Sequence, residues 1–251
     1  MEKFVSRPSL QLSHWQDRVD LACAFRWAAR LGLHEAITNH FSMAVSADGR
    51  EFLINPYGTH FSQIKASDLL LVDADDPHTL ERPDAPDITA WALHSALHRN
   101  QPHARCILHT HSKYATALAC LADSRLPPIE QNSMRFFERV ALDEGFDGMG
   151  LGDEAERVSR LLDGKPVLLM GNHGLLVAAP TIAQAFDDLY YFERACETYI
   201  TALSTGRPLR IASDEVARKT AGQWLDYPDF ADKHFAALKQ ILDQDEPDYS
   251  H

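Results

Sequence analysis

Two histidines one residue apart are the side chains of this sequence most suited to chemistry. His109 and His111 follow the apolar run 106–108. In an extended strand, side chains two residues apart point to the same side of the sheet. Two imidazoles on one side favour a single divalent ion that accepts nitrogen ligands, such as Zn²⁺, Co²⁺, Mn²⁺ or Fe²⁺.

A third histidine stands in similar surroundings. His173 comes shortly after the apolar run 167–170, which is typical of a second buried strand. Three neutral imidazoles that leave coordination positions open would make a catalytic metal site rather than a structural one. The sequence therefore predicts one divalent metal ion, with zinc as the first expectation and iron, manganese or cobalt as alternatives. The competing interpretation is that these are core histidines, each satisfied by a hydrogen bond.

The elements that must position these histidines alternate between strands and helices. Apolar residues at three- and four-residue spacing predict helices at residues 14–33, 89–99, 113–121, 153–163, 182–205 and 213–243. Short apolar runs predict strands at residues 52–54, 69–73, 104–109, 166–170 and 174–178, and a loop that leads into a strand over residues 38–45. Asp48 and Gly49 predict a hairpin turn, so the sheet is at least partly antiparallel. This order predicts an α/β domain whose sheet is covered by helices.

Composition and charge limit the kinds of protein to consider. The net charge of −12 at pH 7 argues against nucleic acid, or an anionic membrane surface, as the main partner. No stretch approaches the about 18–20 apolar residues of a membrane span, and residues 1–7 lack the apolar part of a secretory signal. Beyond residue 224 we expect a C-terminal helix and then a solvated acidic tail at residues 243–246. We expect buried free thiols in a reducing cytoplasm at Cys23, Cys106, Cys120 and Cys196.

The motifs together resemble the class II aldolase and adducin family, which includes the fuculose-phosphate aldolases. The resemblance covers about residues 20–224 and rests on TNHFS at 38–42, INPYG at 54–58, ASDL at 66–69, His94, HTH at 109–111, NHG at 172–174 and ERACE at 193–197. It implies a three-layer α/β/α sandwich around a mainly antiparallel sheet, as a single domain over residues 1–251 with its globular part at about 15–224. It also implies a cytosolic homotetramer, whose metal lies between subunits and is bound by His109, His111 and His173.

The sequence departs from the aldolase pattern where the family carries its proton-transferring glutamate. In the aldolases this glutamate follows two serines that help to bind the substrate phosphate, and the three positions fall here on Ile88, Thr89 and Ala90. Alanine carries no proton. The phosphate loop of the family appears here with a bulky histidine between Asn39 and Ser42, so a sugar phosphate is not favoured. The resemblance implies that substrate is bound by Asn39, Ser42 and Thr89.

Three residues are candidates for the missing proton-transfer group. His40 has an ordinary pKa of about 6.5, which suits proton transfer near neutral pH. His94 lies on the helix before the histidine pair and could approach the metal from there. Glu138 is the nearest downstream carboxylate flanked by aromatic residues. The alternative for His40 is a loop position without a role, and for His94 a hydrogen bond to a backbone carbonyl. For Glu138 it is a surface ion pair with Arg135 or Arg139.

These observations favour a metal-dependent carbon–carbon lyase, of aldolase or decarboxylase type, that acts on a small hydroxy- or oxo-acid with the metal as Lewis acid. Decarboxylation fits the missing glutamate better than aldol cleavage, because it does not require the deprotonation of a substrate hydroxyl. The sequence also resembles an adducin-like bacterial branch of the family, some of whose members are decarboxylases or non-haem iron oxygenases. The alternatives are therefore an iron oxygenase of an aromatic acid and a non-catalytic binding protein like adducin.

Overall fold

The computed structural model describes residues 12–149, 151–227 and 229–251, so the expectation for residues 1–7 lies outside them. The described strands form one seven-stranded sheet with the order β3-β2-β1-β4-β7-β6-β5. The strands are β1 (His40–Ala44), β2 (Glu51–Ile54), β3 (Leu70–Asp73), β4 (Cys106–Thr110), β5 (Val140–Asp143), β6 (Val167–Met170) and β7 (Gly174–Ala179). Neighbouring strands are antiparallel throughout this sheet, except for the parallel pair β5 and β6. The mainly antiparallel sheet that we predicted is confirmed.

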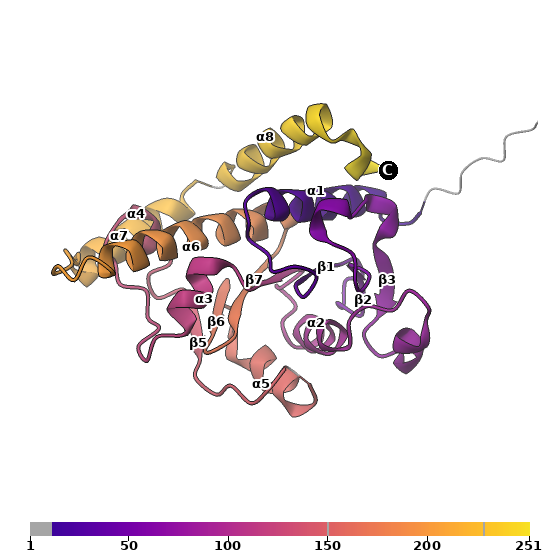
Figure 1. Cartoon of the computed structure of the whole chain (residues 1–251), viewed down its shortest axis with the longest axis horizontal. Coiled ribbons are helices and arrows are strands. Elements are labelled where there is room, and N and C mark those ends of the chain that lie inside the picture. The colour runs from indigo at the N-terminus through magenta and orange to yellow at the C-terminus, as the bar shows by residue number, and fades with distance from the viewer. Residues whose placement is uncertain (1–11, 150, 228) are drawn as a thin grey trace, which may run out of the picture.

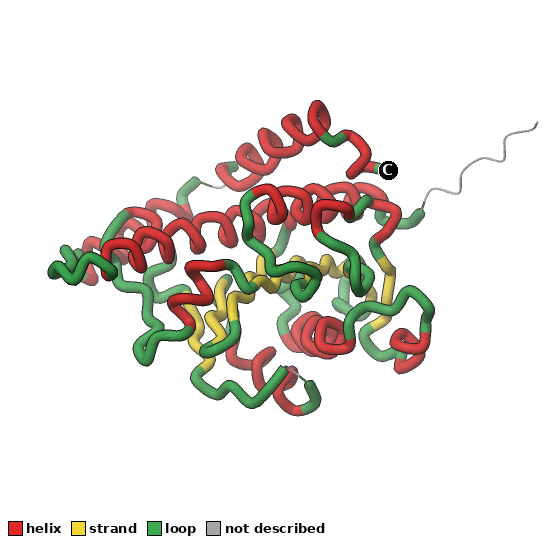
Figure 2. Tube along the Cα trace, viewed as in Figure 1, coloured by secondary structure: helices red, strands yellow, loops and turns green. Residues whose placement is uncertain are grey.

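Helices cover both faces of the sheet and produce three layers (Figure 1; Figure 2 shows the strands between the helical layers). One face packs against α1 (Trp15–Arg30), α3 (Lys113–Ala119) and α6 (Ile182–Leu203), where the largest hydrophobic core lies. The other face packs against α2 (Ile88–Asn100) and α5 (Asp153–Leu161), over smaller apolar clusters. The α/β/α sandwich is therefore confirmed.

The central strand β4 shows how the sequence assigns residues to the two faces. Cys106 and Leu108 belong to the core beneath α1 and α6, whereas Ile107 belongs to the cluster beneath α2 and α5. This alternation is the two-residue period of an extended strand. His109 continues the series on the side of Ile107, so its imidazole faces α2.

The remaining helices lie at the periphery, where one prediction is wrong. The helix predicted over residues 213–243 is two helices, α7 (Asp214–Leu225) and α8 (Phe230–Asp245). The sequence has a proline between them, and proline disfavours the helical conformation for the residue before it. The patterns also did not predict α4 (Gln131–Arg135) or the short strand β5. None of the described helices is both long enough and apolar enough to cross a membrane.

Residues 243–245 of the acidic end are exposed, as expected for a solvated segment, but they end helix α8, and the residues that follow them pack against α1. The buried guanidinium of Arg26 in α1 is paired with Glu246 at 3.1 Å and with Asp248 at 3.0 Å. Tyr249 is completely buried, and its hydroxyl donates to Oδ1 of Asp243 at 2.7 Å. These cationic and apolar partners come from distant parts of the chain, so the local run of acidic residues could not reveal them.

The cysteines follow the expectation with one exception. Cys23, Cys106 and Cys196 are buried free thiols, and burial raises the pKa of each thiol above its ordinary value. Cys120 is exposed at the end of α3, so the prediction that it is buried is wrong.

Candidate metal centre

The sheet register brings two histidines together before any loop is considered. His40 on β1 is directly opposite His109 on β4, and the two ring centroids are 4.8 Å apart. Opposite residues of an antiparallel pair have their side chains on the same face of the sheet. Both imidazoles therefore lie on the face of the sheet that packs against α2.

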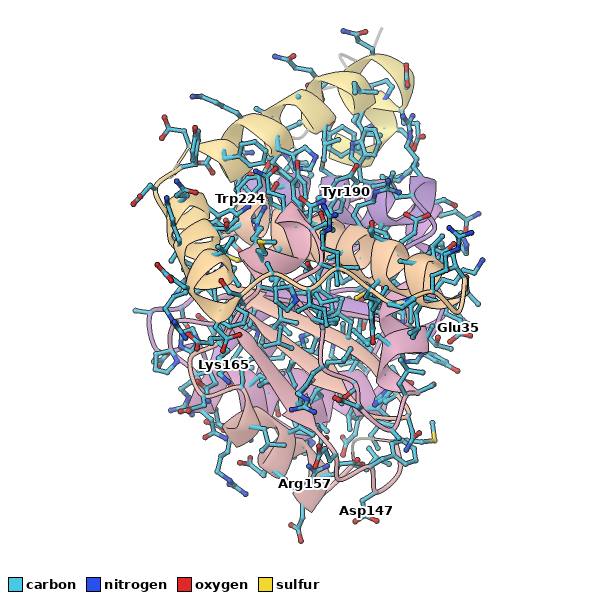
Figure 3. The ribbon with its side chains drawn as sticks, turned by 90° about the vertical axis from the view of Figure 1, so that its left-hand side faces the viewer. Glu35, Asp147, Arg157, Lys165, Tyr190 and Trp224 are labelled. Carbon is cyan, nitrogen blue, oxygen red and sulfur yellow. The ribbon has the colours of Figure 1, made fainter. Side chains whose placement is uncertain are left out.

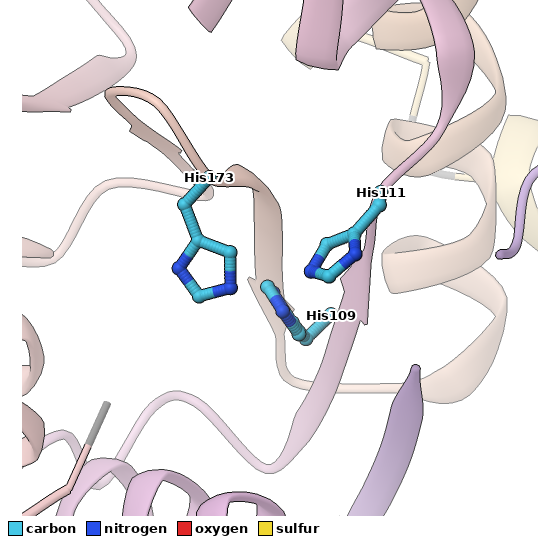
Figure 4. A group of neighbouring side chains, drawn as sticks. All are labelled: His109, His111 and His173. Atoms are coloured by element: carbon cyan, nitrogen blue, oxygen red, sulfur yellow. The ribbon is translucent and has the colours of Figure 1, made fainter. Parts of the chain in front are cut away.

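His111 follows β4, and His173 lies in the turn between β6 and β7; both bring their imidazoles to His109. One ring nitrogen each of His109, His111 and His173 lies within 4.8 Å of the others (Figure 4). The ring centroids of these three residues are 4.9 to 5.0 Å apart. The three rings surround one space, so a single cation there could be bound by all of them.

The residues on either side of His173 explain the Asn-His-Gly motif. Asn172 has φ of 57°, in the left-handed region that asparagine adopts more readily than most residues. A Cβ added to Gly174 would lie 2.7 Å from the carbonyl oxygen of Thr110 and 2.8 Å from Cδ2 of His111. Glycine is therefore required for the turn to pack this closely against the His111 ring.

Hydrogen bonds on the outer side of the rings set their orientation. Nδ1 of His109 donates to the carbonyl oxygen of Leu175 at 3.0 Å. Nδ1 of His111 donates to Oε2 of Glu35 at 2.7 Å, and Glu35 is exposed at the surface (Figure 3). Because carbonyl and carboxylate oxygens only accept, each ring carries a hydrogen on Nδ1, and in its neutral form each has a lone pair on Nε2. Nε2 of His111 is buried and has no hydrogen-bond partner among the described residues.

This donor set fits a metal ion. Metal-binding histidines usually donate their outer N–H to a carboxylate or a backbone carbonyl, which is the arrangement at His111 and His109. Burial and the neighbouring imidazoles lower the pKa of His109 well below its ordinary value, and burial lowers the pKa of His173. These shifts favour the neutral form of His109 and His173, and the neutral imidazole is the form that binds a metal.

A cavity of about 560 Å³ lies beside the three rings. Its other lining residues are Glu35, Ile37, Thr38, His40, Tyr57, Asp87, Thr89, Leu93, Phe146, Gly148, Met149 and Asn172. Neither lysine nor arginine occurs among the described residues that line it. An anionic ligand would therefore meet no cationic side chain among these described residues, and a bound metal would supply the positive charge.

Of the three predicted substrate-binding residues, one lines the cavity and two do not. Thr89 lines the cavity, and its hydroxyl donates to Oδ1 of Asp87. Asn39 and Ser42 are buried behind the cavity wall and do not line it. The side-chain oxygen of Asn39 accepts the backbone N–H of Glu35 at 2.6 Å and that of His111 at 3.3 Å. Asn39 thus connects the two segments that carry Glu35 and His111.

The three proton-transfer candidates also have different positions. His40 lines the cavity, and burial lowers its pKa to about 3. His94 is completely buried behind His40, with its Nε2 atom 2.7 Å from Nδ1 of His40, so it contacts this residue instead of a backbone carbonyl.

Glu138 is not brought to the cavity. It is exposed and forms an ion pair with Arg218 of α7 at 2.6 Å, which lowers the pKa of its carboxyl group. The alternative of a surface ion pair therefore describes Glu138, although the partner is neither Arg135 nor Arg139. Arg135 is instead paired with Asp187 and Asp188.

Two carboxylates that sequence reasoning did not select, Glu35 and Asp87, line the cavity. Asp87 is the N-cap of α2, and its Oδ1 atom accepts the backbone N–H of Thr89 at 2.8 Å and of Ala90 at 3.3 Å. An aspartate before a predicted helix is a recognisable capping signal. No local pattern marks Glu35. Ala90 itself is buried in an apolar cluster with Phe52 and does not line the cavity.

Comparisons with known proteins agree with this architecture. Residues 19–200 match the family model described as the class II aldolase and adducin N-terminal domain. A solved structure of an aldolase II superfamily protein from Pseudomonas syringae is 33% identical and superposes with a TM-score of 0.86, covering 98% of each chain.

Two curated relatives from Streptomyces have names that state an activity. The decarboxylase NovR of Streptomyces niveus is 30% identical, over 88% of this chain and 84% of its own. A protein of Streptomyces roseochromogenus subsp. oscitans, named 4-hydroxy-3-prenylphenylpyruvate oxygenase/4-hydroxy-3-prenylbenzoate synthase, is 29% identical, over 80% of this chain and 73% of its own. The matched family model and the aldolase-type sheet with its histidines at the strand ends lead to one conclusion: this chain belongs to the class II aldolase and adducin family.

Proposed function

We propose that the protein is a metal-dependent carbon–carbon lyase of the decarboxylase type that acts on a small hydroxy- or oxo-acid. The observation that carries the proposal is the set of three convergent imidazoles, of which His109 and His111 donate from Nδ1 to outer acceptors and so direct Nε2 toward the shared space. A divalent metal bound there, zinc in the first instance, would supply Lewis acidity toward a substrate oxygen.

The cavity supports an acid with an apolar or aromatic group. Ile37, Tyr57, Leu93, Phe146 and Met149 offer apolar surface to a ligand. The described lining residues include no cation that could bind a phosphate, so a sugar phosphate is not favoured. A substrate carboxylate would bind beside the three histidines, while its hydrocarbon part contacts the apolar wall.

The residues at the start of α2 support decarboxylation over aldol cleavage. Aldol cleavage requires a group that removes the proton of a substrate hydroxyl, and the position of the family glutamate is Ala90, which is buried away from the cavity. Loss of carbon dioxide breaks the bond to the carboxyl carbon without that step. The electron pair left on the neighbouring carbon is stabilised electrostatically and then takes a proton from water. The name of the relative NovR is in keeping with this reaction class.

An oxygen-dependent reaction is the second candidate. Three imidazoles leave coordination positions open, as an iron oxygenase requires, and the second Streptomyces relative is named an oxygenase. A purely non-catalytic role, as in adducin, is less well supported, since a binding protein has no need for three imidazoles that converge on one space.

The test is an assay of the purified protein with added Zn²⁺, Mn²⁺, Co²⁺ or Fe²⁺. Aromatic 2-hydroxy and 2-oxo acids are supplied with and without oxygen, and carbon dioxide and oxygen uptake are measured. We expect carbon dioxide release that needs the metal and proceeds without oxygen. Release that requires oxygen uptake would instead establish the oxygenase. Cleavage of fuculose 1-phosphate in the absence of any decarboxylation would contradict both.

We also propose that the protein is a single domain, is cytoplasmic and forms a homotetramer. The free cysteines are in keeping with a reducing compartment. Leu225 and Tyr227, at the end of α7, are 62% and 66% exposed, and neighbouring exposed apolar side chains are in keeping with a contact between subunits. Light scattering of the purified protein measures the number of subunits, and a monomer would contradict the proposal.

A further inference from the structure

A chain of hydrogen-bonded side chains runs from the cavity into the protein between β1 and α2. Nδ1 of His40 lies 2.7 Å from Nε2 of His94, whose Nδ1 contacts Oγ of Ser42. Oγ of Ser42 lies 2.7 Å from Nε2 of His98, and Nδ1 of His98 lies 3.0 Å from the carbonyl oxygen of Ala104. The four side-chain members of the chain are each 4% exposed or less.

Regular secondary structure produces this chain. His40 and Ser42 are two residues apart on β1 and therefore share one face of the sheet. His94 and His98 are four residues apart on α2 and therefore share one face of the helix. Where the two faces meet, residues of the strand and of the helix alternate in the order His40, His94, Ser42 and His98.

The carbonyl oxygen at the inner end determines where every hydrogen lies. A carbonyl only accepts, so His98 carries its hydrogen on Nδ1, and as a neutral ring it accepts at Nε2 from the hydroxyl of Ser42. The Ser42 oxygen must then accept from Nδ1 of His94. The neutral His94 ring accepts at Nε2, so His40 donates from Nδ1.

His94 and His98 are neutral because they are buried: burial lowers the pKa of His98 to about 3 and that of His94 well below its ordinary value. At the 2.7 Å contact between Nε2 of His94 and Nδ1 of His40, one nitrogen donates and the other accepts, so the hydrogen is on Nδ1 of His40. In a neutral His40 with its hydrogen on Nδ1, Nε2 has a lone pair and no hydrogen-bond partner among the described residues.

We propose that His98, Ser42 and His94 are positioning residues that hold His40 in its Nδ1–H form, so that Nε2 of His40 accepts a hydrogen bond from a hydroxyl group of the substrate. His40 lines the cavity and its ring lies beside that of His109, so this acceptor is next to the three metal-binding candidates. The inference rests on the proposed function for the statement that a small acid binds here, and it narrows that acid to a hydroxy acid. The carbonyl oxygen of an oxo acid would meet a lone pair at this point and form no hydrogen bond.

Nuclear magnetic resonance tests the hydrogen positions without any substrate. In the full-length chain labelled with ¹⁵N at histidine, near neutral pH, two-bond correlations distinguish the protonated from the unprotonated ring nitrogen. We expect the hydrogen of His40 on Nδ1, both in the metal-free protein and with added Zn²⁺. A hydrogen on Nε2 of His40 would overturn the inference, whatever reaction the protein catalyses.

Two serine variants test whether the hydrogen-bonded chain from His98 to His40 sets the hydrogen position on His40. Ser42→Ala removes the link between His94 and His98, and the Nε2–H form of His40 should then appear. Ser95→Ala is the matched control, because Ser95 is also buried and its hydroxyl has no hydrogen-bond partner among the described residues. A His40 spectrum that is the same in both variants would overturn the role of Ser42.

Binding of two probe acids tests the acceptor. Mandelate and phenylacetate differ only by a hydroxyl, and their affinities for the Zn²⁺-loaded protein are compared by calorimetry. We expect a preference for mandelate that falls by about three- to tenfold in Ser42→Ala, the loss of one hydrogen bond, and is unchanged in Ser95→Ala. A wild-type protein without this preference, or an unchanged preference in Ser42→Ala, would overturn the inference. If the spectra are as expected but no decarboxylation is found, the proposed function is contradicted, while the role of the hydrogen-bonded chain in orienting His40 is retained.

Discussion

Nδ1 of His111 lies 2.7 Å from Oε2 of Glu35, although the two residues are 76 positions apart in the chain. This contact orients the His111 ring, since the carboxylate can only accept. Asn39 connects the same two segments through its side-chain oxygen. A loop residue at the protein surface therefore determines how one imidazole faces the cavity.

Replacement of Glu35 by alanine should weaken metal binding without abolishing it. Loss of an outer carboxylate of this kind reduces metal affinity by about 10- to 100-fold, and we expect the lower end of that range because the Glu35 side chain is 64% exposed. Competition with a coloured chelator measures the affinity for Zn²⁺. Glu81→Ala is the control, because Glu81 makes a similar contact with His78 at 3.0 Å outside the cavity. Equal affinities for the two variants would show that Glu35 has no such role.

His109→Ala and His173→Ala should each lose stoichiometric metal while the fold is retained. Either change leaves only two of the three imidazoles to hold the ion. Elemental analysis after dialysis measures the bound metal, and circular dichroism measures the fold. His78→Ala serves as control, since the His78 side chain is 74% exposed. Full metal occupancy in either of the first two variants would remove that residue from the proposed ligands.

Gly174→Ala should both destabilise the protein and disturb metal binding. The added Cβ would lie 2.8 Å from the His111 ring and 2.7 Å from the Thr110 backbone, and overpacking of this kind costs about 1–3 kcal/mol. Gly222→Ala is the matched control, because a Cβ at this helical position meets nothing within 4 Å. There the free energy of unfolding should rise by about 0.5–1 kcal/mol. Urea unfolding and Zn²⁺ titration of both variants measure these effects. Equal stability and equal Zn²⁺ affinity of the two variants would show that the His173 turn is loosely packed.

Tyr249 should make stability fall at alkaline pH. Burial and the neighbouring Asp243 raise the pKa of its hydroxyl above the ordinary value. Below the unfolded-state pKa of about 10 this contribution is fully present, and it is lost as pH rises beyond that, because the unfolded chain then releases a proton that the folded chain retains. Urea unfolding from about pH 8 to about pH 11 should show a steeper loss for the wild type than for Tyr249→Phe. Parallel pH profiles would mean that Tyr249 titrates equally in both states.

Local sequence patterns were sufficient for the architecture and for the central residues of the candidate site. The alternation of residues 106–108 placed the following histidine pair at the end of a buried strand, and a second apolar run did the same for His173. Periodicity of this kind depends only on the geometry of strands and helices, which is the same in every protein. The family motifs then gave the order of the layers.

The tertiary structure alone decided which side chains support that centre. The sequence by itself determined most of the strands and helices and the three histidines that follow buried strands, because these follow from interactions between residues close together in the chain. It did not determine that Glu35 orients His111, that His94 pairs with His40, or that Tyr249 is buried against α1. These contacts join residues from separate elements, and their partners are selected by strand register and helix packing, which no local pattern encodes.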